Sequence, residues 1–340
     1  MKMKAMMLKA SRKLQLEEVK QPALMGDRAL VRVTHSGICG TDLKIYSGGI
    51  PVQYPLIMGH EMCGELAEGG DGRYRPGTRV IIDPCLFCAT CYCCHAGGTG
   101  LCPHGGLIGR DANGGFADYL ISPSNAIFPL PDTINSRQAP LIQVATTCLH
   151  AQRRAEIFPG QSVVVLGLGV AGQIHVQMAK ARGAYPVIGI TRSAWKRSLA
   201  EKLGADATLP GGPAAEKAVL EATHGQGADV VIESTGKLPV MASALNMARP
   251  GGKILLFGIT TATEGALPFY QFYFKELTLI NARAAKNEDF PATIDLVARG
   301  LLNLDALITH VLPLSELDSA LGLLDSDADE RMKIIIDNSL

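Results

Sequence analysis

Four cysteines between residues 88 and 102 have the spacing expected of a metal site. The segment that begins at Cys85 reads CLFCATCYCCHAGGTGLC, and within it Cys88, Cys91, Cys94 and Cys102 follow the pattern C-x2-C-x2-C-x7-C. Four thiolates at this spacing can close a tetrahedron around one Zn2+. A disulfide knot or a set of buried apolar thiols would be the alternatives, but the chain has nine cysteines, an odd number, and shows no recognisable secretory signal. Because four thiolates leave no open coordination position, this zinc is predicted to be structural.

A second set of metal-binding side chains lies upstream. Cys39 stands in GICGTDLKIY, and His60 and Glu61 stand in MGHEMCG, so a thiolate, an imidazole and a carboxylate come from two separate segments. Each residue alone is also explained as a buried cysteine, a core histidine or a surface glutamate. Ligands this far apart cannot be joined by spacing, so the residues by themselves leave the question of a catalytic zinc open.

A glycine-rich turn follows the apolar segment SVVVL and precedes a helical segment. It reads GLGVAG and comprises Gly167, Gly169, Val170, Ala171 and Gly172. Between a strand and a helix, the first glycine allows a tight turn, the second leaves room for a pyrophosphate, and the third permits close packing of the helix on the strand. The N–H groups that begin the helix would face the anion. The pattern therefore predicts dinucleotide binding in preference to a purely structural turn.

The end of the next strand predicts which dinucleotide is bound. The strand VIGI runs into Thr191, Arg192 and Ser193, with Lys196 and Arg197 close behind, so no carboxylate is placed to hold the ribose 2′-hydroxyl of NAD. A hydroxyl, a guanidinium and nearby cationic side chains suit a 2′-phosphate, and we therefore predict NADP in preference to NAD. In the alternative interpretation, Arg192 is a solvated surface charge and the site merely tolerates NADP.

The composition indicates a folded protein that acts on small molecules. The 340 residues are 47% hydrophobic, which supplies cores for two domains or one large one, and 32 basic residues balance 32 acidic ones. A net charge of zero leaves no basic surplus for nucleic acid or an acidic membrane. Lys9, Arg12 and Lys13 interrupt the apolar run at the N-terminus, and no segment has the roughly 18 apolar residues of a membrane span. A cytoplasmic location is expected.

Two patterns of alternation divide the chain. Before about Gln143, short apolar segments such as ALVRVTHSGIC and RVIIDP are bounded by Gly and Pro, which predicts a β-rich domain. Beyond it, apolar strands such as SVVVLGLG and PVIGIT alternate with helical segments, which predicts a doubly wound parallel sheet, hence an α/β fold. The last strand of this sheet is expected near ELTLINAR. The terminal strand KIIID is expected to pack back on the first domain.

Four segments, taken in their order along the chain, closely resemble the zinc-dependent medium-chain dehydrogenase/reductase family, which includes alcohol, polyol, sugar and threonine dehydrogenases. They are GICGTDLKIYSGG, PLIMGHEMCGEL, the four-cysteine segment and VVVLGLGVAG. The likeness extends over essentially the full chain. It implies a GroES-like catalytic domain (residues 1–145), a Rossmann domain (residues 146–283) and a C-terminal segment (residues 284–340) that completes the catalytic domain, with the active-site cleft between the domains. It also implies two Zn2+ per chain and a homodimer or homotetramer.

The resemblance assigns roles to individual residues. Cys39, His60 and Glu61 would lie at the catalytic zinc, and Thr41 would be the hydroxyl that hands on the substrate proton. The four cysteines described above would hold the structural zinc. Lys44 stands where many relatives carry the histidine that ends the proton relay. Either the lysine amine relays the proton, or Thr41 passes it through the cofactor ribose and water.

A further departure from the family pattern is Gln143, in the segment LIQV. Polyol and threonine dehydrogenases of the family usually show glutamate here, and other alcohol dehydrogenases a third ligand cysteine. Gln143 is a neutral and weaker oxygen donor. It would touch the zinc directly or hold its water, much as in some glucose dehydrogenases that this region resembles.

The implied function is hydride transfer between an alcohol, polyol or sugar hydroxyl and NADP or NAD. A threonine or amino-alcohol dehydrogenase is an alternative within the family. A zinc-independent enoyl or quinone reductase generally lacks both cysteine-containing sets. From a different class, a non-enzymatic zinc- and NADP-binding redox sensor also remains open, and the sequence does not indicate which hydroxyl compound is the substrate.

Overall fold

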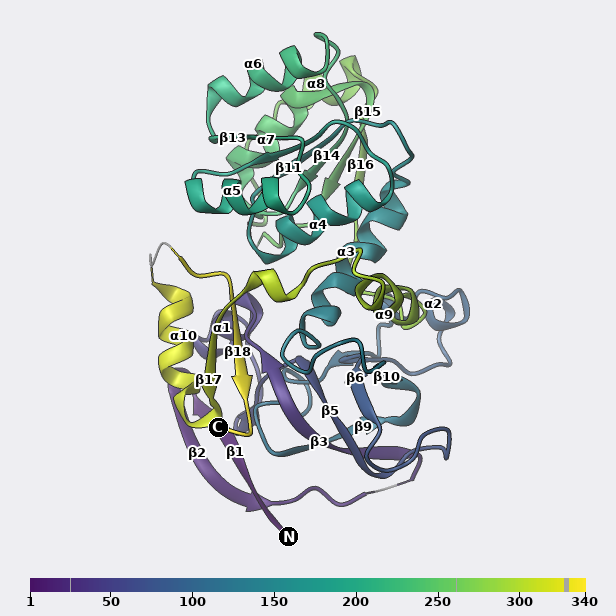
Figure 1. Ribbon diagram of the computed structural model, residues 1–340, viewed down its shortest axis with the longest axis vertical. Helices are drawn as coiled ribbons and strands as arrows, with labels where there is room; N and C mark the ends of the chain where they lie inside the picture. The colour runs from purple at the N-terminus through teal and green to yellow at the C-terminus, as the bar shows by residue number, and fades with distance from the viewer. Residues whose placement is uncertain (25, 261, 327–329) are drawn as a thin grey trace. The chain divides into compact units, whose positions relative to one another are not determined.

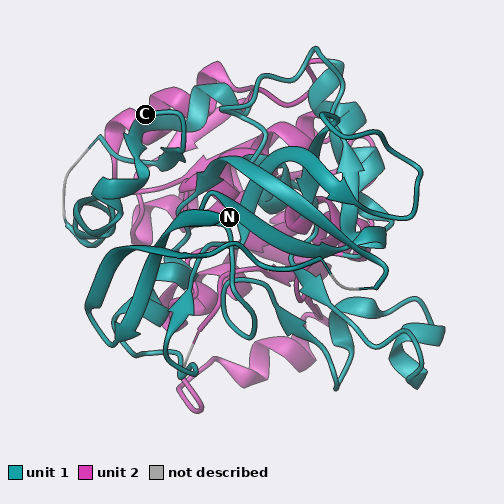
Figure 2. Cartoon of the chain, turned by 90° about the horizontal axis from the view of Figure 1, so that it is seen from below, with its two compact units in different colours: residues 1–146, 286–299, 304–340 teal, residues 147–285, 300–303 magenta. Residues whose placement is uncertain are grey.

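The computed structural model describes residues 1–24, 26–260, 262–326 and 330–340. The chain divides into two compact units, which Figure 2 distinguishes by colour. Unit 1 comprises residues 1–146, 286–299 and 304–340, and unit 2 comprises residues 147–285 and 300–303. Unit 1 therefore contains both ends of the chain. The short return of residues 300–303 to unit 2 has no counterpart in the sequence pattern.

Within the described residues, unit 1 is built on a seven-stranded sheet. The strands follow the order β10-β6-β5-β3-β18-β17, and β9 also pairs with β3. Their bounds are β3 Arg28–Gly37, β5 Glu61–Gly69, β6 Arg79–Ile82, β9 Tyr119–Pro123, β10 Ile127–Pro129, β17 Ile308–Pro313 and β18 Lys333–Asp337. A smaller sheet has the order β2-β1-β4, formed by β1 Lys2–Ala10, β2 Lys13–Lys20 and β4 Leu56–Ile57. A short pair joins β7 Cys85–Leu86 and β8 Gly106–Leu107.

The strand β3 shows why these segments form a sheet. Val31 and Val33 are fully buried while Arg32 between them is exposed, as expected of a strand that packs one face on a core. The two valines share a hydrophobic cluster with Leu66 of β5 and Val80 of β6. Branched apolar side chains at every second position thus join three neighbouring strands into one layer.

The C-terminal strand β18 lies in this sheet, as the sequence predicted. It pairs antiparallel with β3, where Ile335 faces Gly37, and parallel with β17. Figure 1 shows the yellow β18 beside the purple β3, although the two strands come from opposite ends of the chain. The end of β3 is therefore flanked by β18 on one side and by β5 on the other.

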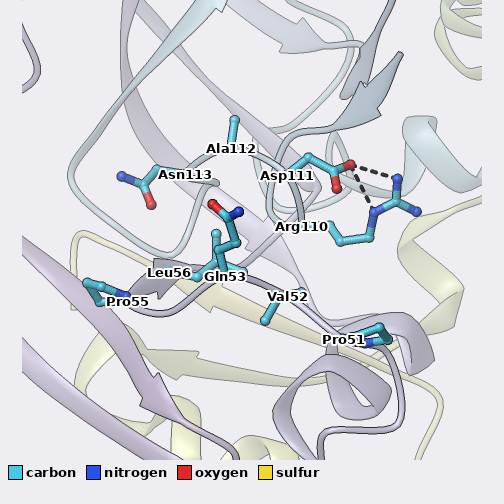
Figure 3. Close-up of a pocket in the computed structure, with 9 residues that line it drawn as sticks. All are labelled: Pro51, Val52, Gln53, Pro55, Leu56, Arg110, Asp111, Ala112 and Asn113. Carbon is cyan, nitrogen blue, oxygen red and sulfur yellow. Dashed lines mark hydrogen bonds and ion pairs between the residues drawn. The ribbon is translucent and has the colours of Figure 1, made fainter. Parts of the chain in front are cut away.

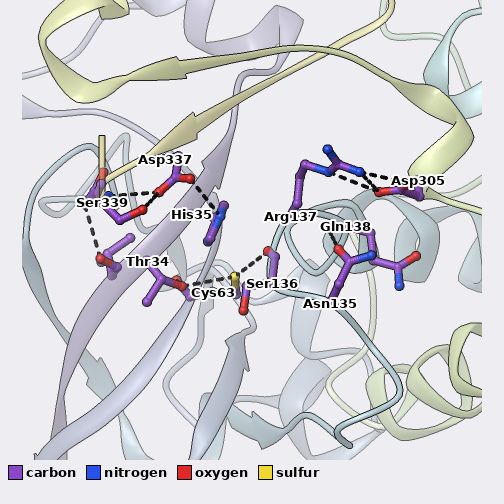
Figure 4. A network of polar contacts seen from close by, with 12 residues as sticks. Thr34, His35, Cys63, Asn135, Ser136, Arg137, Gln138, Asp305, Asp337 and Ser339 are labelled. Carbon is purple, nitrogen blue, oxygen red and sulfur yellow. Dashed lines mark hydrogen bonds and ion pairs between the residues drawn. The ribbon is translucent and has the colours of Figure 1, made fainter.

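A polar network fixes this tail to the sheet (Figure 4). His35 Nε2 lies 3.4 Å from Asp337 Oδ2, and the Ser339 hydroxyl donates to Asp337 at 2.6 Å. Nearby, the Cys63 thiol donates to the main-chain oxygen of Ser136 at 3.4 Å. Burial raises the pKa of Cys63 to about 12. Cys63 is therefore a protonated, structural cysteine, a role that the sequence did not reveal.

Unit 2 contains the predicted doubly wound sheet. Among its described residues, six strands run in the order β13-β12-β11-β14-β15-β16, and all neighbouring pairs are parallel. Their bounds are β11 Val163–Leu166, β12 Val187–Ile190, β13 Ala207–Leu209, β14 Ala228–Glu233, β15 Ala248–Leu256 and β16 Thr278–Asn281. The strand order reverses between β12 and β14 around β11, the position where such sheets bind nucleotides. The predicted fold class is confirmed.

Two layers of helices cover this sheet. Val163 and Val165 of β11 belong to one hydrophobic cluster with side chains of α4 (Val170–Ala181) and α5 (Ala194–Lys202). The alternate residues of the same strand belong to a second cluster with side chains of α6 (Pro213–Ala222) and α7 (Leu238–Met247). Successive side chains of a strand point to opposite faces, so the continuous apolar run of β11 is explained by burial on both faces. The helices can be followed in Figure 1.

The remaining helices have the following bounds: α1 Gly40–Tyr46, α2 Tyr92–His95, α3 Leu141–Ala155, α8 Phe269–Phe274, α9 Asp289–Ala298 and α10 Leu317–Asp325. In the described ranges, no helix has both the length and the apolar character needed to cross a membrane.

Candidate metal and cofactor sites

The four cysteines of the predicted structural zinc site lie together. The Sγ atom of Cys91 is 3.5 Å from that of Cys94 and 3.8 Å from that of Cys102. The Sγ atoms of Cys102 and Cys88 are 3.6 Å apart. Sulfurs at about 2.3 Å from a tetrahedral Zn2+ would be roughly 3.8 Å from one another. The arrangement therefore fits a Zn2+ ion bound by four thiolates.

The protonation of these thiols also favours a cation. Hydrogen bonds led by the Thr90 hydroxyl lower the pKa of Cys88 to about 5. Desolvation and the neighbouring sulfurs raise the pKa of Cys94 to about 12. One thiolate is thus stable in the metal-free group, but a full set would repel unless a positive charge lay among them. Cys85 and Cys93 lie outside the group.

The structure also assembles the second set. Cys39 precedes α1 just beyond the end of β3, and His60 and Glu61 lie where β5 begins. One potential ligand atom from each of the three residues lies within 4.8 Å of the other two. His60 and Glu61 are buried, at 5% and 1% exposure. The pairing of β3 with β5, in which Gly37 faces Glu61, brings together residues that are far apart in sequence.

Asp42 lies behind this group, and the sequence analysis missed it. Its buried carboxylate accepts the N–H of Cys39 at 2.9 Å, and its other oxygen lies 3.2 Å from His60 Nδ1. Burial lowers the pKa of His60, but the charges and hydrogen bonds of Asp42 and Cys39 outweigh burial, so that the pKa of His60 lies well above its ordinary value. Asp42 can therefore orient the imidazole through Nδ1 and leave Nε2 available for a metal.

A buried ion pair completes the surroundings of Glu61. Lys333 Nζ lies 2.5 Å from Glu61 Oε2 and donates to the main-chain oxygen of Ile38 at 3.0 Å. Burial lowers the pKa of Lys333, but Glu61 and Cys39 together raise it above its ordinary value. Gly37 makes room for this pair, since a Cβ at that position would lie 2.3 Å from Glu61 Oε2. Lys333 thus links Glu61 to the segment that carries Cys39.

The charges of this group favour a divalent cation. If Cys39 is a thiolate and both carboxylates are ionised, Cys39, Asp42 and Glu61 carry three negative charges, and Lys333 carries one positive charge. His60 must be neutral to bind a metal, and two negative charges would then remain in a largely buried group, which costs several kcal/mol per ion. In the metal-free group the raised pKa of His60 lets a protonated imidazole offset one of them. A Zn2+ ion would neutralise them, and thiolate and imidazole are donors that zinc prefers. The residues present therefore fit zinc.

The predicted proton-relay residues lie on α1, directly after Cys39. Thr41 and Lys44 are three positions apart, so they share a helix face, and both are partly exposed. Gln143 lies in the first turn of α3 and is buried, at 8% exposure. Its side chain forms no hydrogen bond within the residues that the structure describes, which leaves its amide free for a ligand.

The glycine turn has the shape of a pyrophosphate site. Gly167, directly after β11, has a φ of +92°, and a Cβ there would lie 2.5 Å from the Thr235 side chain. Gly169 has open space where a Cβ would stand. A Cβ on Gly172 would lie 1.9 Å from the main-chain oxygen of Gly167. One glycine therefore permits the turn, one leaves room for a ligand, and one lets α4, which begins with Val170 and Ala171, pack closely.

The segment after β12 is held by Arg197, a residue predicted to bind the cofactor. Its Nη1 donates to the main-chain oxygens of Thr191 and Arg192, each at 2.8 Å. The side chain of Arg192 is exposed, and Thr191 and Ser193 are partly exposed. No carboxylate stands at residues 191–193. Arg192 is therefore the cation offered at the end of β12, whereas Arg197 is bound to the main chain.

Unit 1 also contains a cavity of about 670 Å3 beside β4. Figure 3 shows that Gln53 and Asn113 line it from two facing segments, and that Arg110 and Asp111 form an ion pair at one side. The full lining comprises Pro51, Val52, Gln53, Pro55, Leu56, Arg110, Asp111, Ala112 and Asn113. None of these residues belongs to the predicted site.

The sequence contains a local signal for the role of Asp42 but none for that of Lys333. Asp42 lies within GICGTDLKIY, where an acid three residues after the cysteine is in reach of the Cys39 N–H. Lys333 begins the apolar strand KIIID, and a lysine at the start of such a strand normally reaches solvent. No local signal pairs Lys333 with a residue 272 positions earlier.

Comparison with known proteins agrees with this geometry. Residues 26–132 match the alcohol dehydrogenase GroES-like domain, and residues 170–299 match the zinc-binding dehydrogenase family. L-galactonate-5-dehydrogenase of Escherichia coli is 33% identical over 296 residues, which cover 86% of each chain. The chain belongs to the zinc-dependent medium-chain dehydrogenase/reductase family. It is an NAD(P)-dependent alcohol or polyol dehydrogenase, and the alternative of a non-enzymatic redox sensor is not supported.

Two solved structures show how closely this dehydrogenase follows the family fold. A zinc-binding dehydrogenase from Sinorhizobium meliloti bound to NADP has a TM-score of 0.92 at 31% identity, covering 99% of both chains. An alcohol dehydrogenase from E. coli in complex with NADH has the same TM-score at 26% identity and the same coverage. The two neighbours hold different nicotinamide cofactors. The fold alone therefore does not determine which cofactor is used.

Proposed function

We propose that this dehydrogenase oxidises a hydroxyl group at a zinc ion held by Cys39, His60 and Glu61, with Gln143 as a further, neutral oxygen donor beside it. The observation that carries the proposal is the group in which one potential ligand atom from each of Cys39, His60 and Glu61 lies within 4.8 Å of the other two, with Asp42 beside His60 and Lys333 beside Glu61. When bound, zinc supplies Lewis acidity, which lowers the pKa of a substrate hydroxyl. A second zinc at the four cysteines has a purely structural role.

The residues of α1 supply the path for the proton. The Thr41 hydroxyl accepts the substrate proton while it gives up its own, and Lys44, on the same helix face, passes that proton towards solvent. The cofactor ribose and water offer the alternative path for the proton from Thr41. A bound nicotinamide would accept the carbon-bound hydrogen as hydride, and in the reverse direction it would supply hydride to a ketone or aldehyde. Asp42 keeps His60 oriented throughout, since it contacts Nδ1.

NADP is the cofactor that we propose for this site. Thr191 occupies the position where an acid would hold the ribose of NAD and repel a 2′-phosphate. The exposed guanidinium of Arg192 can offer two parallel N–H bonds to phosphate oxygens, an interaction of about 1.5–3 kcal/mol. Such an interaction corresponds to roughly a ten- to hundredfold difference in affinity.

A polyol or a sugar-derived hydroxyl compound is the proposed substrate class. The name of the E. coli relative, L-galactonate-5-dehydrogenase, supports it, because that relative covers most of the chain. A threonine or amino-alcohol dehydrogenase remains the second candidate within the family. A panel of polyols, sugar acids, amino alcohols and simple secondary alcohols, followed by NADPH absorbance, would distinguish them. The proposal requires turnover of polyols or sugar acids to exceed that of amino alcohols.

Metal analysis tests the zinc assignments. The wild type should contain two Zn2+ per chain, and Cys39→Ser should retain one zinc and lose turnover. Cys93→Ser is the matched control, since Cys93 lies outside both groups and should keep both zincs and full activity. Full activity of Cys39→Ser, or a wild type that is active without zinc, would refute the proposal.

Cofactor selectivity is tested with three proteins. The kcat/KM of the wild type should be higher for NADP than for NAD. Arg192→Ala should weaken NADP while sparing NAD, and Thr191→Asp should reverse the preference. A wild type that prefers NAD, or an unchanged ratio in Arg192→Ala, would show that Arg192 is only a solvated surface charge.

A further inference from the structure

Arg197 makes contacts unlike those of the other cationic side chains after β12. A single nitrogen, Nη1, donates to two consecutive main-chain oxygens, those of Thr191 and Arg192, at 2.8 Å each. Because the guanidinium is planar and rigid, two bonds from one of its nitrogens fix the orientation of both peptide groups. Its charge also offsets the partial negative charge of both oxygens, which would otherwise repel a nearby anion.

The orientation of these two peptide groups has a consequence for their N–H groups. In a planar trans peptide, the C=O and N–H bonds point in opposite directions. Holding the oxygens of Thr191 and Arg192 therefore directs the N–H groups of Arg192 and Ser193 away from Arg197. Neither N–H has a hydrogen-bond partner within the part of the chain that the structure describes. Two successive free N–H groups next to an exposed guanidinium are the elements of an anion-binding turn.

The position of Arg197 is itself fixed relative to the glycine turn. The buried side chain of Gln173, from α4, donates to the main-chain oxygen of Lys196 at 2.8 Å and to that of Leu168 at 3.4 Å. Lys196 directly precedes Arg197 on α5, and Leu168 lies within GLGVAG. One side chain therefore couples the predicted pyrophosphate turn to the helix that carries Arg197.

From these contacts we infer that Arg197 is a positioning residue for cofactor specificity, which holds the 191–193 turn so that Arg192 and two main-chain N–H groups face a 2′-phosphate. This inference rests on the proposed preference for NADP. Nη1 of Arg197 is already shared between two carbonyl oxygens, so the role inferred for Arg197 is to hold the turn and not to bind the phosphate. Without Arg197, the turn loses its fixed orientation, and Arg192 contributes less to the binding of the 2′-phosphate.

A double-mutant cycle separates this role from direct phosphate binding. Equilibrium dissociation constants would be measured for NADPH, for NADH and for 2′,5′-ADP in the wild type, Arg192→Ala, Arg197→Met and the double variant. Arg197→Met should weaken NADPH and 2′,5′-ADP on the order of tenfold and NADH much less. In the Arg197→Met background, Arg192→Ala should cause only a small further loss, because the two residues act through one turn. Arg197→Lys should restore part of the affinity, since an ammonium group can also donate to both oxygens.

Each outcome separates the inference from the function on which it rests. Additive losses would show that Arg197 binds the phosphate independently of Arg192. Unchanged NADPH binding by Arg197→Met would show that Arg197 has no role. Either result would overturn the inference and leave the preference for NADP intact. An unchanged NADPH affinity in Arg192→Ala would show that Arg192 does not contact the phosphate and would overturn the inference as well. A wild type that binds NADH as tightly as NADPH would instead refute the proposed preference. Arg154→Met, which removes an exposed arginine of unit 2, is the control for loss of one positive charge. Thermal unfolding of each variant shows whether the turn or the whole unit is affected.

Discussion

The two candidate zinc sites described above are built in different ways. One is the four-cysteine group, and the other is the Cys39 group, which comprises Cys39, His60 and Glu61. The first comes from one segment of 15 residues, Cys88–Cys102, and three of its four cysteines are partly exposed. The second joins residues from the ends of two strands, β3 and β5, and two charged side chains, Asp42 and Lys333, support it from buried positions. A closed set of four thiolates needs no further groups. An open site with fewer ligands needs neighbours that set the charge and orientation of each one.

This difference predicts where the two sites are vulnerable. The four-cysteine group should depend on its ligands alone. The Cys39 group should depend as much on residues that do not touch the metal. Four substitutions test the comparison, and their effects on the Cys39 group should decrease in the order Lys333, Asp42, Gln143 and Cys91.

Lys333→Met should have the largest effect. It leaves the Glu61 carboxylate buried without its partner, which should lower the free energy of unfolding by about 3–5 kcal/mol. The loss should be greater after zinc is removed, because the metal supplies part of the missing positive charge. The double variant with Glu61→Gln should recover much of the stability. Denaturant unfolding with and without zinc measures this, and equal stabilities of the single and double variants would contradict it.

Asp42→Asn should weaken the catalytic metal without removing a ligand. The carboxylate contacts His60 Nδ1, and loss of such a partner typically reduces metal affinity by about 10–100-fold. Competition with a chromophoric chelator would show one zinc released more easily, while the four-cysteine zinc remains bound. Asp71→Asn, at an exposed aspartate of the same unit, is the control. Unchanged retention of both zincs in Asp42→Asn would mean that Asp42 does not support the metal.

Gln143→Glu should produce a smaller change. A negative charge beside the metal should strengthen zinc retention but weaken its Lewis acidity, so the pH at which activity rises should move upward by roughly one unit. The pH profile of kcat/KM measures this shift. Gln138→Glu adds the same charge just before α3 and should leave the profile unchanged. If Gln143→Glu also leaves it unchanged, Gln143 has no role near the metal.

Cys91→Ser should have the smallest effect on turnover. Loss of one ligand should destabilise the protein by about 2 kcal/mol or more, as expected for loss of a metal site, yet the kcat of the folded fraction should stay close to normal. Thermal unfolding and zinc content, compared with those of Cys93→Ser, measure the two effects separately. A Cys91→Ser variant of full stability would refute a structural zinc at this group.

Local patterns in the sequence were sufficient to predict several structural features of this protein. The spacing of Cys88, Cys91, Cys94 and Cys102 predicted a group that the structure shows, because ligands within 15 residues meet through short turns. The glycine turn after β11 was equally predictable, since the backbone conformation or the space at each position, which depends on nearby residues, favours glycine. The doubly wound sheet followed from apolar strands that alternate with helices, because burial on both faces leaves a continuous apolar run.

Only the tertiary structure decided the surroundings of the Cys39 group. Pairing of β3 with β5 and β18 brings Glu61 beside Gly37 and Lys333, although Lys333 lies 272 positions away from Glu61 in sequence. Arg197 likewise had the residue type of a phosphate ligand, but its Nη1 is shared by two carbonyl oxygens. Residue type limits what a side chain can do, whereas its partner depends on which groups the fold places within about 3 Å, and strand pairing over long separations carries no local signature.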